Sequence, residues 1–350
     1  MNRKSNYKEY LKSHKTEKGG KEITNTSIKG YYGGNFHIPQ EEYGEFLAMY
    51  YREVVSKGGD EFLTEKQMQT GPIAVDLDFR YELDVDEKQY DLGFIKTLML
   101  NYLDVCKEVF QLEPNKTIPF YVFEKPDVNH LPEKNITKDG IHMLIGLHCG
   151  REVQRIIRDK VIVKTKEEFD EFPIINSWED VFDEGISKGT VNWQLYGSKK
   201  PDHQSYRLTH AYTYEYDASD GEFMEKKVDL KTFNWERDIF KLSVRYDKHP
   251  EFFVKSNIAG IVNSMKSQSP RKMVRNEIRA SRGINILNVK NHDELKACVD
   301  EFLAGLGTTE YNIREAHEYT MILPISYYGN GSYEKWIRVG WVLANIHDKL

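Results

Sequence analysis

Hydrophobic and polar residues alternate with two different periods along this chain, and these periods locate its secondary structure. Between residues 72 and 81, apolar side chains occupy every second position, which predicts a strand with one buried face. Between 92 and 109, they recur every three or four residues, which predicts an amphipathic helix. The same patterns predict helices at 43–51, 151–160 and 177–188, and strands at 117–123, 141–147 and 191–196.

The order of these elements predicts the fold class. Strand, helix, two strands, helix and strand form an α+β sandwich, in which an antiparallel sheet carries helices on one side. This arrangement is close to that of RNA-recognition motifs. The turn at 217–221 predicts one more hairpin, and residues 1 to about 35, which are polar and rich in Lys and Gly, predict a loosely ordered arm or edge segment.

The composition changes near residue 255, which predicts a domain boundary. Residues 256–285 are rich in Lys and Arg and poor in apolar residues, so we expect a basic linker or an exposed helix there. Residues 286–350 contain two further helical patterns. We therefore expect a main domain over 1–255, a basic linker over 256–285 and a small helical region over 286–350.

Charge and cysteine content limit the classes of protein to which this chain can belong. The 350 residues carry 49 Lys and Arg against 55 Asp and Glu, a net charge of −6, which argues against binding nucleic acid through bulk positive charge alone. The three cysteines form no CxxC pair, which excludes a zinc ribbon or disulfide framework within this chain and favours a reducing compartment. Without a signal-peptide pattern or an apolar run of ~18 residues, we expect an intracellular protein that is not secreted and has no membrane partner.

Two carboxylates alternate with apolar residues in the first long predicted strand. Asp76 and Asp78, in Val75-Asp-Leu-Asp78, share one face, with Cα atoms roughly 6.5–7 Å apart. Such a pair can hold one or two Mg²⁺ or Mn²⁺ ions, which prefer carboxylate and phosphate oxygens. A solvent-facing strand with two ordinary acids would show the same pattern.

A second motif, Lys138-Asp-Gly-Ile-His142, opens another predicted strand. Gly140 allows a ligand to approach the backbone and shares a strand face with His142, whereas Lys138 is expected in the preceding turn. A Lys and a His that converge on one point suit a nucleoside triphosphate. The alternative is a hairpin turn followed by a half-buried histidine.

A third motif, Gly197-Ser-Lys-Lys200, follows the strand predicted at 191–196. Its backbone N–H groups, the Ser198 hydroxyl and the ammonium groups of Lys199 and Lys200 could form an anion site, although a simple basic loop gives the same pattern.

The helix predicted over 177–188 returns toward this third motif and carries Asp180, Asp183 and Glu184 as candidates for a third metal-binding carboxylate. Two-metal phosphoryl transfer requires carboxylates for the ions and cations for a triphosphate. The chain offers both on three strands that we expect to be neighbours in one sheet.

With these motifs, the sequence resembles the archaeo-eukaryotic primase superfamily, and more closely the primase part of poxvirus-type primase-helicases of large DNA viruses. The apolar-Asp-apolar-Asp/Glu, small-x-His and helix-acid motifs of the superfamily match Asp76 and Asp78, Gly140-Ile-His142 and Asp183. Asp180 stays open as an alternative to Asp183.

Further matches to the viral branch are Tyr196-Gly-Ser-Lys-Lys-Pro201, Tyr206-Arg-Leu-Thr209 and Phe123-Glu-Lys-Pro126. The chain departs from related primase-polymerases at Gln194, where they carry an Arg, so triphosphate contacts are expected to shift to Lys199 or Lys200.

The resemblance implies an archaeo-eukaryotic primase fold with an RNA-recognition-motif-like catalytic sheet over residues 1–255, and a helical region that leads to a superfamily-three helicase C-terminal to residue 350. It implies a DNA-dependent primase, also able to act as a primase-polymerase, that makes primers in viral DNA replication by two-metal nucleotidyl transfer. Its cofactors would be Mg²⁺ or Mn²⁺, and its partners nucleoside triphosphates, replication proteins and a single-stranded DNA template lying across the sheet. The implied metal ligands are Asp76, Asp78 and Asp183, and the implied triphosphate contacts are Arg80, Lys138, His142, Ser198, Lys199 and Lys200.

Two other functions remain as alternatives. A metal-dependent glycosyltransferase could hold a nucleotide sugar through Asp76 and Asp78, but it gives no reason for the lysines and histidine of the other motifs. A non-catalytic RNA-recognition-like module could dock a single strand or a replication partner, and it predicts that Asp76→Ala leaves binding intact.

Overall fold

The computed structural model describes residues 6–17, 22–28, 33–268, 311–329 and 331–346, with a few single positions between 296 and 303. The chain divides after Ser269 into two compact units, Met1–Ser269 and Pro270–Leu350. None of the described helices is long and apolar enough to cross a membrane.

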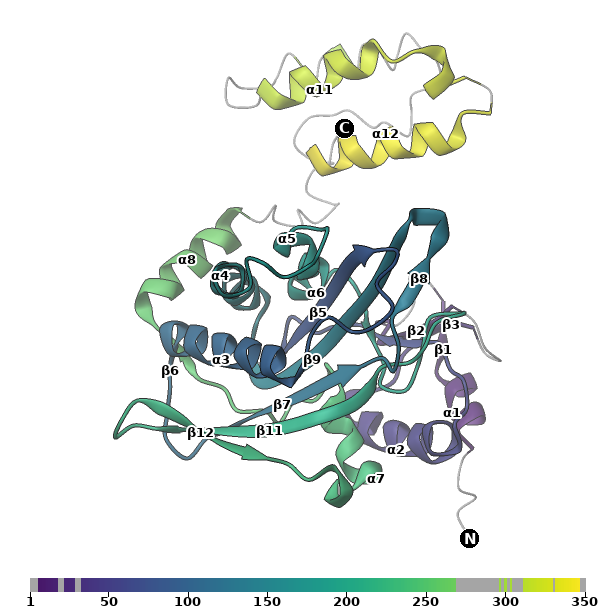
Figure 1. Ribbon diagram of the computed structural model, residues 1–350. Coiled ribbons are helices and arrows are strands. Elements are labelled where there is room, and N and C mark those ends of the chain that lie inside the picture. Colours follow the sequence, from purple (N-terminus) through teal and green to yellow (C-terminus); the bar gives the residue numbers. More distant parts are fainter. Residues whose placement is uncertain are drawn as a thin grey trace. The chain divides into compact units, whose positions relative to one another are not determined.

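A six-stranded antiparallel sheet lies at the centre of the first unit (Figure 1). Its two longest strands, β5 (Thr70–Glu82) and β9 (Ile136–Gly150), pair along most of their length. The strand order is β12-β11-β7-β9-β5, and β8 pairs with the outer part of β9. This arrangement confirms the α+β class and the predicted hairpin at 217–221. The other strands are β7 (Thr117–Glu124), β8 (Asn129–Leu131), β11 (Arg207–Asp217) and β12 (Glu222–Lys227).

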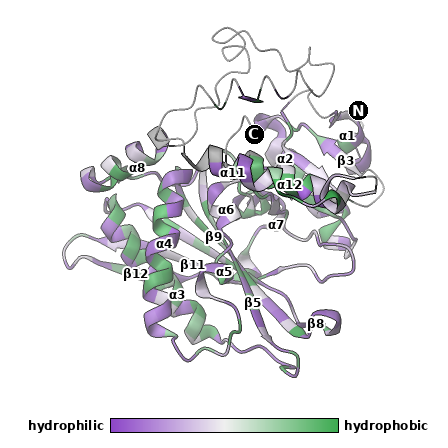
Figure 2. Cartoon of the chain, turned by 90° about the horizontal axis from the view of Figure 1, so that it is seen from above, coloured by the Kyte–Doolittle hydropathy of each residue, from purple (hydrophilic) through white to green (hydrophobic). Residues whose placement is uncertain are grey.

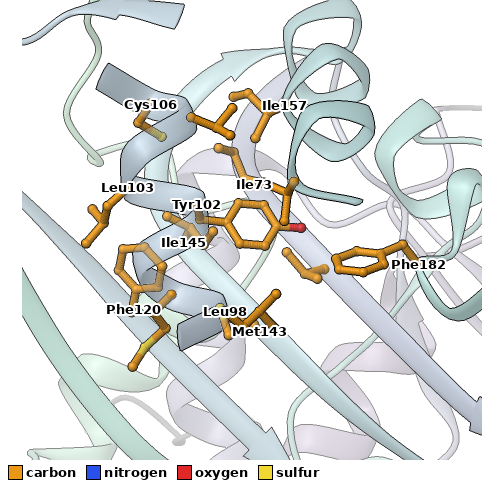
Figure 3. Close-up of a cluster of buried hydrophobic side chains, with 14 of the residues drawn as sticks. Ile73, Leu98, Tyr102, Leu103, Cys106, Phe120, Met143, Ile145, Ile157 and Phe182 are labelled. Atoms are coloured by element: carbon orange, nitrogen blue, oxygen red, sulfur yellow. The ribbon is translucent and has the colours of Figure 1, made fainter. Parts of the chain in front are cut away.

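Two long helices, α3 (Leu92–Val109) and α4 (Arg151–Glu168), cover one face of this sheet (Figure 1). Both mix hydrophobic and hydrophilic residues along their length, as amphipathic helices do (Figure 2). The odd-numbered residues of β5, from Ile73 to Tyr81, are buried in the core that these helices close. Figure 3 shows Tyr102 of α3 among Ile73, Ile145 and Ile157 in this core. Because the odd-numbered positions are filled with apolar side chains, the even-numbered face of β5 is the one that can carry polar chemistry.

A smaller sheet, with strand order β1-β3-β2-β4-β10, packs with α1 (Tyr7–Ser13) and α2 (Tyr43–Glu53) around a second apolar core. Of the two expectations for residues 1 to about 35, the loosely ordered arm is wrong for the described part, because Tyr7 and Leu11 are buried in this core, whereas the edge segment fits, because β1 is an edge strand of the smaller sheet. The strands are β1 (Lys15–Thr16), β2 (Asn25–Ser27), β3 (Gly34–Phe36), β4 (Leu63–Glu65) and β10 (Trp193–Gln194).

Three further expectations need correction. The strand predicted at 191–196 is the short β10, which pairs with β4 of the smaller sheet and not with the central sheet. The helix predicted at 177–188 is two short helices, α5 (Trp178–Val181) and α6 (Glu184–Lys188), because Phe182 between them forms a β-bridge with Leu77. Lys138 lies inside β9 and not in a preceding turn.

The first unit includes a helix beyond residue 255. Residues Ser256–Gln268 form α8, whose Ile258 and Val262 are buried in the core of the first unit, so this unit extends past residue 255. In the second unit, α11 (Tyr311–Met321) and α12 (Tyr333–Ile346) lie in contact. The remainder of the predicted linker and most of the first helical pattern within 286–350 lie outside the described residues, so the three-part division stays a prediction.

Short elements complete the described chain. They are β6 (Phe110–Gln111) paired with β13 (Phe253–Val254), α7 (Trp235–Asp238), and the 3₁₀ turns Gln40–Glu42, Val55–Lys57, Pro132–Lys134, Leu230–Thr232, Ile239–Leu242 and Ile325–Tyr327.

Candidate active site

Asp76 and Asp78 lie on the even-numbered face of β5, away from α3 and α4. The strand register places His142 of β9 directly opposite Asp76 and Gly140 opposite Asp78. The Nε2 atom of His142 is 3.4 Å from Oδ1 of Asp76, and Nζ of Lys138 is 2.7 Å from Oδ2 of Asp78. Two of the three sequence motifs therefore meet across one pair of strands.

A segment that runs along the open edge of β5 brings in Asp183. The Asn176 side chain donates to the Asp78 carbonyl and accepts from Arg80 N–H, both at 3.0 Å, and Asp183 N–H donates to the Asp76 carbonyl at 3.0 Å. Covering an edge strand in this way satisfies its backbone groups. The same hydrogen bonds carry Asp183 next to Asp76, where its Oδ1 also caps α6 through Gly185 N–H.

His142 sits in an aromatic slot between the two sheets. Its ring stacks on the Tyr206 ring, with the two ring centroids 3.6 Å apart, and the centroid of the Trp193 ring of β10 lies 4.6 Å from that of His142. Gly140 makes room for this stack, because a Cβ at this position would lie 2.4 Å from the Leu77 carbonyl oxygen and 2.9 Å from the Tyr206 hydroxyl. The glycine of the small-x-His motif is thus required by packing.

The motifs line one cleft of about 590 Å³ between the central and the smaller sheet. Ligand sites typically enclose roughly 300–1,000 Å³, so a nucleotide-sized molecule fits. Seven of the residues predicted from the sequence line this cleft: Asp76, Asp78, Lys138, His142, Asp183, Lys199 and Lys200. Asp180 and Glu184 do not line it, which favours Asp183 as the third carboxylate.

Two predicted triphosphate contacts lie elsewhere. Ser198 is only 1% exposed, and its hydroxyl bonds the Tyr50 hydroxyl at 2.9 Å and accepts from Leu63 N–H at 3.2 Å. Its hydroxyl is therefore engaged in holding the loop against the smaller sheet. Arg80 does not line the cleft, and its guanidinium lies 3.6 Å from Asp78.

The charges around Asp76 keep its carboxylate ionised. Burial raises the pKa of Asp76, but His142, and then Lys200 and Lys125, outweigh burial and hold this pKa below its ordinary value. An ionised carboxylate is the form that binds a cation.

The donor set suits a divalent cation. Carboxylate oxygens are the ligands that Mg²⁺ and Mn²⁺ prefer, and Asp76, Asp78 and Asp183 all face the cleft. Within the part of the chain that the structure describes, no three His, Cys, Asp or Glu side chains are already gathered as a metal site. Lys138 and His142 instead lie against Asp78 and Asp76, so these partners must yield when a cation binds.

Several cleft residues were not singled out from the sequence. Lys125 directly follows β7, and Tyr206 directly precedes β11, so both lie at the same end of neighbouring strands. Lys125 and Tyr206 belong to segments that match the viral primase branch, but the sequence assigns them no role. Trp193 is one more aromatic residue of a predicted strand and His203 one more loop histidine, and neither feature indicates a site. A Lys at the end of a central strand was the one signal that could have found Lys125.

Comparisons with known proteins cover the same residues as the cleft. Residues 24–212 match the family described as C962R protein N-terminal AEP domain, where AEP denotes archaeo-eukaryotic primase. A putative helicase, L207/L206 of Acanthamoeba polyphaga mimivirus, is 29% identical over 203 residues, which is 57% of this chain and 20% of that protein. The chain thus spans about a fifth of the length of this curated relative. The resemblance inferred from the motifs is confirmed, and the chain belongs to the C962R-type family of archaeo-eukaryotic primase domains, whose function is of the primase type.

Proposed function

We propose that this chain synthesises primers on a single-stranded DNA template by nucleotidyl transfer. The observation that carries the proposal is the meeting of Asp76, Asp78 and Asp183 with His142 and several lysines in one cleft. Acidic ligands and cations in one cavity suit a substrate whose triphosphate is charged and which arrives with divalent cations.

Asp76, Asp78 and Asp183 would hold Mg²⁺ or Mn²⁺, which when bound activates the attacking hydroxyl and neutralises the leaving pyrophosphate. His142 would donate to a phosphate oxygen. Its ring is held between Tyr206 and Trp193, so little conformational entropy is lost on binding even when a cation takes the place of its contact with Asp76. Lys138 would turn from Asp78 toward the phosphates.

The template would follow the cleft and not the sheet. Tyr121 and Phe123, on the site face of the central sheet, are 6% and 3% exposed beneath a segment that includes Val228 and Trp235. A strand of DNA cannot stack on rings that are already covered, so we propose that the template avoids this part of the sheet and follows the cleft. The same burial argues against a non-catalytic RNA-recognition-like module that would stack bases on these two rings.

A helicase is the partner that the comparisons favour. The mimivirus relative is named a putative helicase, and this chain aligns with only a fifth of it. We infer that the domain acts in viral replication joined to a helicase of the superfamily-three type.

Primer synthesis on a single-stranded template with Mn²⁺ or Mg²⁺ tests the proposal. Wild type should give template-dependent products, and Asp76→Ala/Asp78→Ala should give none. The matched control is Asp84→Ala/Asp86→Ala, which changes an exposed Asp pair with the same spacing outside the cleft and should retain synthesis. Normal products from the Asp76/Asp78 variant would defeat the mechanism, and turnover of nucleotide sugars in place of triphosphates would favour a glycosyltransferase.

A further inference from the structure

The lysines of the cleft differ in whether their charge is already neutralised. Nζ of Lys138 lies 2.7 Å from Asp78, and Nζ of Lys199 lies 2.8 Å from Asp60. Among the described residues, Lys125, Lys134 and Lys200 also line the cleft and take part in no ion pair within 4 Å. These ammonium groups therefore have no carboxylate partner in the described part of the chain, and Lys125 and Lys200 are the two whose segments are joined by hydrogen bonds.

Hydrogen bonds join the two segments that carry these lysines. The Asp127 backbone N–H donates to Oε1 of Gln204 at 3.2 Å, and the Gln204 amide donates back to the Asp127 carboxylate at 2.7 Å. Lys125 lies two residues before Asp127, and Lys200 lies in the loop that leads to Gln204. The Lys125 turn and the Lys200 loop are thus fixed side by side.

Aromatic contacts connect Lys125 to the proposed catalytic centre. Its ammonium lies 4.8 Å from the centroid of the Tyr206 ring, within the range of a cation–π interaction. Tyr206 stacks on His142, which in turn contacts Asp76. Lys125 is therefore placed beside the centre by Tyr206 without being neutralised by it.

We propose that Lys125 and Lys200 form the subsite that binds the polyphosphate of the incoming nucleotide, with Tyr206 as the residue that positions Lys125. This inference rests on the proposed function and adds to its assignment, since Lys138 must first leave Asp78 and Lys199 must first leave Asp60 before either can bind a phosphate. His203 also lines the cleft; burial, Lys125 and Lys200 lower its pKa, so it offers these lysines a neutral imidazole neighbour.

Electrostatics support this assignment. Burial and the neighbouring Lys200 lower the pKa of Lys125, so the pair is unfavourable while no anion lies between its members. A polyphosphate would replace this repulsion by charge-assisted hydrogen bonds, which are about twice as strong as neutral ones.

Binding of inorganic tripolyphosphate, measured by calorimetry at fixed salt, tests the subsite apart from catalysis. Lys125→Met and Lys200→Met should each weaken binding about tenfold or more, as expected for hydrogen bonds between charged groups. Lys226→Met, an equal charge change at an exposed position of β12, should change it less than twofold. Lys125→Arg, which keeps the charge, should retain most of the wild-type affinity for tripolyphosphate. Tyr206→Leu should reduce this affinity less than Lys125→Met does.

The outcomes separate this inference from the proposed function. Unchanged tripolyphosphate binding in both methionine variants would overturn the subsite even if wild type makes primers. Weakened binding in these variants, with thermal stability retained, would uphold the subsite even if wild type makes none. If Lys226→Met lost as much affinity for tripolyphosphate as Lys125→Met and Lys200→Met, only the net charge would matter, and this result would also overturn the subsite.

Discussion

The close approach of Gly140 to its neighbours makes Gly140→Ala a sensitive test of the site's construction. The added Cβ would lie 2.4 Å from the Leu77 carbonyl oxygen, and this distance must grow to at least 3.0 Å, so β5 and β9 must separate where Asp78 faces Gly140. Overpacking of this kind costs about 1–3 kcal/mol. Alanine recovers about 0.4–1 kcal/mol by restricting the unfolded chain. The net loss should be about 1–2 kcal/mol, or roughly 3–6 °C in melting temperature for a unit of this size.

Thermal unfolding and primer synthesis should be measured together on this variant. Gly260→Ala is the matched control, since nothing lies within 4 Å of the added Cβ and the residue is inside helix α8. Alanine is the better helix former by up to about 1 kcal/mol, so the control should be as stable as wild type or more so. The shifted strands should also displace His142 from Tyr206 and reduce synthesis in Gly140→Ala. If Gly140→Ala has the same melting temperature as Gly260→Ala and makes normal primers, the packing argument is refuted.

Two further changes test a buried carboxyl and the competition for Asp78. Burial raises the pKa of Glu65 to about 7, so the folded protein keeps a proton that the unfolded chain releases near 4.5. The stability from this group is full below pH ~4.5 and is lost as pH rises to about 7, by up to about 3 kcal/mol. Urea unfolding at pH 5 and at pH 7.5 should therefore show a smaller decrease in the free energy of unfolding for Glu65→Gln than for wild type. An equal decrease in the two proteins would contradict the raised pKa of Glu65. Lys138 and Asp78 are about one-third exposed, so their ion pair contributes about 1 kcal/mol at most, and Lys138→Met should strengthen Mn²⁺ binding up to about fivefold by calorimetry. Lys226→Met is the control, and weaker or unchanged Mn²⁺ binding in Lys138→Met would rule the competition out.

The sequence was most informative where local periodicity decides the structure. The alternation through Asp76 and Asp78 and the helical spacing from 92 to 109 predicted β5 and α3, because one buried face is enough to fix each pattern. The sequence also predicted that the strands of Asp76 and His142 are neighbours, and the register of these strands places the two residues opposite each other.

Predictions failed where contacts distant in sequence override local pattern. The 177–188 segment has helical spacing, but Phe182 joins the edge of β5, where backbone hydrogen bonds are available. Ser198 follows a strand and resembles an anion-binding turn, but Tyr50, 148 residues earlier, engages its hydroxyl. Neither partner can be identified from the residues around the motif.

Because contacts distant in sequence decide which charges are paired, a basic motif is a poor guide to which lysine binds a ligand. Lys199 and Lys200 are adjacent in sequence and equal in chemistry, but Asp60 lies beside only one of them. Lys125 lies far from both in sequence, and the pairing of β7 with β11 and the hydrogen bonds between Asp127 and Gln204 bring it to the same wall. A charge is available to a substrate when the fold leaves it without a carboxylate partner, and that property belongs to the tertiary structure. The assignment of Lys125 and Lys200 therefore depends on their surroundings, and the affinity of the methionine variants for tripolyphosphate measures those surroundings directly.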